Sequence, residues 1–67
     1  MTKKEREHME LEAFKIAALR IEAKKTLAEI KNRKGPELED IKRRLKWQIK
    51  AYTKDLEIIN YYLKNFE

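Results

Sequence analysis

The residues with the clearest potential for chemistry lie near the start of the chain. Glu5 and His8 have the Glu-x-x-His spacing that di-iron four-helix bundles use, and Glu12 follows His8 by one helical turn. Side chains spaced in this way on a helix can share a metal ion. However, the motif is short, it lies at a helix end, and the chain has one histidine and no cysteine. We therefore expect a surface histidine, no metal site and no cofactor.

Catalytic motifs are also missing from the sequence. The chain has one glycine and no cysteine, which excludes a Gly-rich phosphate loop and a Cys/His pair, and no Ser/His/Asp set is present. The acidic pairs have i,i+3 or i,i+4 spacings that place them on a helical surface. We therefore predict that the protein is not an enzyme and has no small-molecule substrate.

A basic run extends from Lys42 to Lys54, contains no acid and includes Trp47. Cations that neutralise phosphates and an aromatic ring that stacks on bases are typical of nucleic-acid binding. These residues spread around a helix, and the acids at 37, 39 and 40 lie close by. We expect a solvated face instead, and a basic nucleic-acid-binding hairpin dimer remains an alternative.

The elements that position these residues are two helices. Thr2 and Glu5 form a capping box that begins the first helix. Gly35 can take the left-handed conformation that ends a helix, and Pro36 suits the first position of the next one. Nothing else in the 67 residues breaks a helix. We predict a single all-α domain over 1–67, an antiparallel two-helix hairpin with helices at about 3–33 and 36–66 that assembles into a helical bundle.

An apolar seam joins the two helices. In the second helix, apolar residues follow alternating steps of four and three from Leu45 to Phe66, which is the repeat of a left-handed coiled coil. In the first helix, apolar residues recur every seven positions from Met9 to Ile30. The predicted core contains Met9, Ile16, Leu19, Ala23, Leu27 and Ile30, packed against Leu38, Ile41, Leu45, Ile49, Tyr52, Leu56, Ile59 and Leu63.

The first helix carries more apolar surface than one partner helix can cover. A second stripe widens its apolar arc to roughly 200°, at about 100° per residue. The second helix carries aromatic residues on the side away from its seam. A chain this short without disulfides usually needs a partner for stability. We therefore expect a homo-oligomer, in the first instance a dimer, whose interface contains Phe14, Ala17, Ile21, Ala28, Trp47, Ile58 and Tyr62.

Three polar residues lie near the predicted packing surfaces. Glu12 and Arg20 fall near the apolar arc of the first helix, and Gln48 lies at the edge of the seam. They could form a buried polar network that determines register and copy number. They could equally extend their polar ends into solvent at the rim. The sequence leaves both interpretations open.

The whole chain resembles de novo designed helical-hairpin oligomers. The features are the Thr2 to Glu5 cap, the turn at 34–38, the near-absence of other Gly or Pro, and surface positions filled with Lys and Glu. The resemblance implies a symmetric bundle with no natural substrate. The chain is also similar to the plasmid copy-number regulators of the Rop type, which are RNA-binding hairpin dimers. A third similarity is to type III secretion needle co-chaperones, around Trp47 and 58–61, and it implies a heteromeric adaptor.

Nothing in the sequence indicates a membrane or an export signal. No run of 18 apolar residues is present, and the charged segment 1–12 lacks the apolar region of a signal peptide. We therefore expect a cytoplasmic protein with no membrane contact. If the chain is designed, no cellular compartment applies to it.

Overall fold

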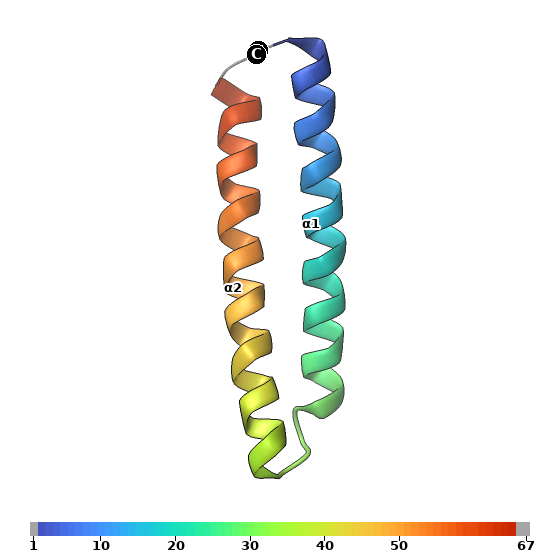
Figure 1. The fold of residues 1–67 in the computed structure, drawn as a ribbon, viewed down its shortest axis with the longest axis vertical. Helices are drawn as coiled ribbons and strands as arrows, with labels where there is room; N and C mark the ends of the chain where they lie inside the picture. The colour runs from blue at the N-terminus through green and yellow to red at the C-terminus, as the bar shows by residue number, and fades with distance from the viewer. Residues whose placement is uncertain (1, 66–67) are drawn as a thin grey trace.

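Two antiparallel helices make up the structure, a computed structural model that describes residues 2–65 (Figure 1). Helix α1 spans Lys3–Ile30, and helix α2 spans Pro36–Asn65. The beginning of α1 and the end of α2 lie at one end of a rod of 49 × 14 × 13 Å, and the turn lies at the other end. The predicted all-α hairpin is confirmed, whereas its assembly into a bundle stays a prediction.

The start of α1 is capped by Thr2 as its sequence predicts, whereas no hydrogen bond from the Glu5 carboxylate back to Thr2 completes the predicted capping box within the described residues. Thr2 has an extended backbone, and its Oγ1 accepts a hydrogen bond from the Glu5 amide at 3.2 Å. The Thr2 carbonyl accepts from the Arg6 amide at 3.0 Å, which begins the helical ladder. The side chain thus satisfies one of the amides that a helix start leaves without a partner.

The turn differs from the prediction in one respect. Helix α1 ends at Ile30, whose carbonyl accepts a turn-closing bond from the Arg33 amide at 3.0 Å. Gly35 lies beyond that end, has φ +154°, and accepts from the Glu39 amide at 3.0 Å. The expectation that Gly35 ends the first helix is therefore wrong, because Gly35 instead caps α2. Non-helical residues are needed here to cross the 8–10 Å that separates the axes of packed helices, at about 3.3 Å per residue.

The inner seam follows the predicted repeat closely. Ala23 is the only buried residue among those that the structure describes, with 7% of its surface exposed. The remaining confirmed seam residues are half-buried, because two helices enclose each side chain on one side only. They are Met9, Ile16, Leu27, Ile30, Leu38, Leu45, Ile49, Tyr52, Leu56, Ile59 and Leu63. Phe66, which would extend the seam, lies outside the described residues.

Two predicted core residues are wrong. Leu19 is 51% exposed and Ile41 is 43% exposed, while their neighbours Arg20 and Lys42 are half-buried in the seam. Seven-residue spacing explains the exchange, since Leu27 lies seven positions after Arg20 and Ile49 seven after Lys42. The long stems of Arg and Lys can pack in such positions while their charged ends reach a polar partner.

Exposed apolar side chains are common on the outside of this rod. Even so, neither helix within residues 2–65 contains a stretch that is long and apolar enough to cross a lipid bilayer.

Gly35→Ala should lower the free energy of unfolding by about 1–3 kcal/mol, the usual range for a side chain held in a sparsely populated backbone conformation. A Cβ at Gly35 would meet no atom closer than Leu38 Cδ1, at 3.9 Å, so the loss would arise from φ +154° and not from a clash. Urea unfolding at constant protein concentration measures it. Lys34→Ala, at the exposed preceding position, is the control. Equal stabilities of the two variants would contradict this role of Gly35.

Candidate interaction surfaces

The outer side of α1 carries an apolar stripe that α2 does not cover. Phe14 is 72% exposed and Ile21 is 63% exposed, and Ala28 is also exposed. These three residues are spaced by seven, so they lie along one line of the helix. Ala17, between the first two, is half-buried. The structure thus places four of the predicted interface residues together on one helix.

The outer side of α2 carries the aromatic residues. Trp47 is 70% exposed, and Ile58 and Tyr62 are about half exposed. Tyr61 contacts Tyr62 edge to face, with ring centroids 5.9 Å apart and planes at 83°. This arrangement is favourable for aromatic pairs and holds the two rings in place. The predicted interface residues of α2 therefore form a second stripe, separate from that of α1.

Additional large apolar residues are exposed that the predicted interface omits. They are Leu11, Leu19, Ile41 and Tyr61. Leu11 is three residues from Phe14, so it extends the α1 stripe toward the start of the helix. Leu19 was predicted to lie in the core because it flanks the seven-residue repeat, and Ile41 because it extends the seam of the second helix toward the turn. Only the observed register shows that they face outward.

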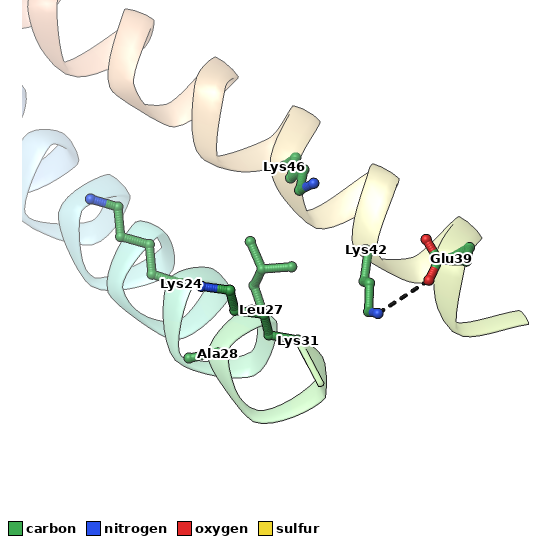
Figure 2. A pocket seen from close by; sticks show the side chains of 7 residues that line it. All are labelled: Lys24, Leu27, Ala28, Lys31, Glu39, Lys42 and Lys46. Atoms are coloured by element: carbon green, nitrogen blue, oxygen red, sulfur yellow. Dashed lines mark hydrogen bonds and ion pairs between the residues drawn. The ribbon is translucent and has the colours of Figure 1, made fainter. Parts of the chain in front are cut away.

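A basic groove lies between the helices near the turn (Figure 2). It has a volume of about 430 Å³. Leu27 points from α1 toward α2, and Ala28 lies beside it. Four lysines and one glutamate form the rest of the lining: Lys24, Lys31, Lys42, Lys46 and Glu39. An apolar floor edged by ammonium groups can accept a carboxylate or a phosphate group.

Lys42 differs from the other groove lysines because it secures the turn. Its Nζ donates to the Arg33 carbonyl at 2.6 Å and lies 3.2 Å from Glu39 Oε1. Only 13% of its side chain is exposed. By contrast, Lys24, Lys31 and Lys46 are exposed and make no hydrogen bond or ion pair within residues 2–65. These three ammonium groups are therefore available to an incoming anion.

The predicted basic run does not act as one unit. Lys42 and Lys46 face the groove, whereas Arg43, Arg44 and Trp47 lie around a separate hollow with Asp40. Arg43 Nη1 lies 3.9 Å from Asp40 Oδ1. Lys24 and Lys31, which line the same groove, lie outside the basic run that the sequence predicts. Their spacing of seven, one turn before and one turn after Leu27 and Ala28, was the available signal.

The polar residues near the seam divide into two cases. Arg20 Nη1 donates to Thr53 Oγ1 at 3.4 Å, and that hydroxyl donates to the Ile49 carbonyl at 2.8 Å. This partly buried chain of bonds links the two helices. Glu12 instead lies 3.7 Å from Lys15 Nζ at the surface, and Gln48 is half-buried. A polar contact across the seam is therefore present at Arg20 alone of these three.

The Glu-x-x-His motif is not assembled into a ligand set. His8 is exposed, and the backbone amide of Glu5 donates a hydrogen bond to the Thr2 hydroxyl. Within the part of the chain that the structure describes, no three His, Asp or Glu side chains come together in a way that could hold a metal ion.

No protein-family model matches the chain, and searches of curated proteins and of solved structures found no match.

Lys42→Met should lower the free energy of unfolding by about 1–3 kcal/mol, the usual contribution of a hydrogen bond from a charged group. Methionine keeps most of the stem but loses the donor to the Arg33 carbonyl. Lys46→Met is the matched control, since Lys46 lies one turn away and is exposed, and its effect should stay within about 0.5 kcal/mol. Urea unfolding compares both variants with the wild type. A stable Lys42→Met variant would show that the bond to the turn is dispensable.

Proposed function

We propose that this protein is a structural hairpin that associates with copies of itself to form a homo-oligomeric helical bundle, with a dimer as the simplest form. The observation that carries the proposal is the outer stripe of α1. Phe14 and Ile21 are more than three-fifths exposed, although α2 already covers another side of the same helix. A helix that is apolar on two sides is typical of one that lies between two neighbours.

The total surface area supports the same proposal. The accessible surface is 5795 Å², whereas a compact monomer of 8.2 kDa has about 4,500 Å². A stable protein–protein interface buries about 800 Å² per partner. The excess surface of one hairpin is therefore sufficient for one interface of standard size. An additional layer of helices would also bury the half-exposed seam more completely.

The two stripes affect the geometry of assembly. The stripe of α1 and the aromatic stripe of α2 lie on different helices and both face away from the seam. One flat partner surface cannot cover both of them. We infer that α1 provides the first contact between copies, and that Trp47, Ile58 and Tyr62 contact a copy in the resulting bundle.

Ile21→Glu should dissociate the assembly. A charge buried without a partner costs several kcal/mol, and each 1.4 kcal/mol changes the dissociation constant tenfold, so we expect an increase of about a hundredfold or more. Light scattering after size exclusion, over a concentration series, measures the mass as a multiple of 8.2 kDa. Circular dichroism confirms that the helices remain.

Thr26→Glu is the control, because it adds the same charge at an exposed site of α1 away from the stripe. An Ile21→Glu variant that keeps the mass of the wild type would exclude the α1 stripe as the interface. A wild-type chain that is a well-folded monomer at all concentrations would exclude self-association itself.

A second candidate function is binding of a phosphate polyanion, and the basic groove is the observation that favours it. Lys24, Lys31 and Lys46 come from both arms of the hairpin and line one groove with the apolar Leu27 and Ala28. Fluorescence anisotropy with a labelled RNA duplex at several salt concentrations tests this function. Affinity that falls steeply with salt, and that Lys24→Gln weakens, would favour it over self-association alone.

A further inference from the structure

Helix α1 and its C-cap residue Lys31 carry a second repeat of the coiled-coil type on their outer side. Eight residues follow alternating steps of three and four, and all of them are exposed except the half-buried Ala17. They are Glu7, Glu10, Phe14, Ala17, Ile21, Lys24, Ala28 and Lys31, and we call them the outer series. The inner seam has the same alternation and packs on α2. The outer series has the spacing needed to pack on another helix in the same manner.

The outer series changes in charge along its length. Its first two members are acids, its middle is apolar, and Lys24 and Lys31 near its end are basic. If two copies of α1 paired in parallel, acid would face acid and lysine would face lysine. If they paired antiparallel, Glu7 and Glu10 of each copy would approach Lys24 and Lys31 of the other. Opposite charges attract and like charges repel at these distances, so the pattern favours the antiparallel pair.

Full overlap of the outer series is compatible with a two-fold axis. In that register Glu7 faces Lys31 of the second copy, and Glu10 faces Ala28, between the two lysines. The symmetry centre then falls between Ala17 and Ile21. Small residues at 17 and 28 allow the two helix backbones to approach closely. A two-fold pair of this kind uses the same patch on both copies and therefore closes on itself.

The basic groove is the place where the acids of the second copy would arrive. Lys24 and Lys31 belong to the outer series and also line the groove, together with Lys46 from α2. All three ammonium groups lack a partner within residues 2–65. In the hairpin alone, Glu10 Oε1 accepts from Arg6 Nε at 3.1 Å, a surface ion pair of small net value. This pair does not prevent Glu10 from turning to a lysine of a second copy.

The aromatic stripe of α2 lacks this self-complementary pattern. Arg44 and Lys54 lie among its aromatic residues, and no acid–base polarity runs along it. It therefore contains no equivalent signal for the orientation of a partner.

We propose that α1 pairs with α1 of a second copy in antiparallel orientation, with the carboxylates of Glu7 and Glu10 bound at Lys24 and Lys31 of that copy. The proposal rests on the self-association proposed above and adds the helix that makes the contact, its direction and its charged contacts.

Two charge-reversal variants test the orientation. One is Glu7→Lys with Glu10→Lys, and the other is Lys24→Glu with Lys31→Glu. Each makes the two ends of the outer series alike in charge, so an antiparallel pair becomes repulsive and its dissociation constant should rise at least tenfold at low ionic strength. An equimolar mixture of the two variants restores attraction at both ends. Light scattering should then show a heterodimer with the affinity of the wild type.

A fourfold variant that combines all four reversals is the internal check on folding. It has the composition of the wild type with the polarity inverted, and it should associate as the wild type does. Lys15→Glu with Lys64→Glu is the control for net charge, because it changes the same number of exposed lysines outside the outer series. Its affinity should stay close to that of the wild type.

The outcomes separate the two proposals. A wild-type chain that remains monomeric overturns self-association. A wild-type oligomer whose two charge variants associate as tightly as it does overturns the antiparallel pair, since a parallel pair has like charges facing one another in every one of these proteins. If each variant associates weakly alone and the mixture does not recover the wild-type affinity, the pairing of Glu7 and Glu10 with Lys24 and Lys31 is overturned.

Discussion

The contact between α1 and α2 along the inner seam is the interaction on which the rest of this structure depends. A helix has surface all around it, and a hairpin supplies each helix with only one neighbour. The seam therefore holds the hairpin together while leaving its own residues half-buried, and Ala23 alone is buried among the residues described. The apolar side chains exposed on the outside of both helices follow from this limit of one neighbour for each helix. A third or fourth helix is the physical remedy, and copies of the same chain are its simplest source.

The turn shows how the seam constrains local structure. The two axes must lie within packing distance of each other, so the chain leaves α1 at Ile30 and crosses before it can start α2. Gly35 takes a backbone conformation that other residues rarely adopt and caps the second helix. Lys42, nearly two turns into α2, then reaches back to the Arg33 carbonyl. A polar residue in the seam thus has a structural task at the one place where the helical ladder is interrupted.

The outer side of α1 combines the two features that the sequence analysis treated separately, an apolar stripe and a basic region. Lys24 and Lys31 are adjacent to Ala28 and Ile21 on the same face, and they also line the groove next to α2. Charge near an apolar stripe contributes less to the strength of association than burial of the stripe does, but it decides the direction of the partner. Our proposals therefore assign the strength of the contact to Phe14 and Ile21 and its orientation to the acids and lysines at the two ends of the series.

The sequence by itself determined the helices, the single turn and twelve of the fourteen predicted core residues, because caps, breakers and a seven-residue repeat are local signals. It also identified Phe14, Ala17, Ile21 and Ala28 as surplus apolar surface. Only the tertiary structure decided that Arg20 and Lys42 take the seam positions expected for Leu19 and Ile41. A pattern of apolar residues does not predict a polar residue in the seam, because such a residue is stable there only when the fold supplies a hydrogen-bond partner. Here the partners are the Thr53 hydroxyl for Arg20 and the Arg33 carbonyl for Lys42. The groove could not be predicted for the same reason, since its lysines come from both arms of the hairpin and line one groove only when the hairpin closes.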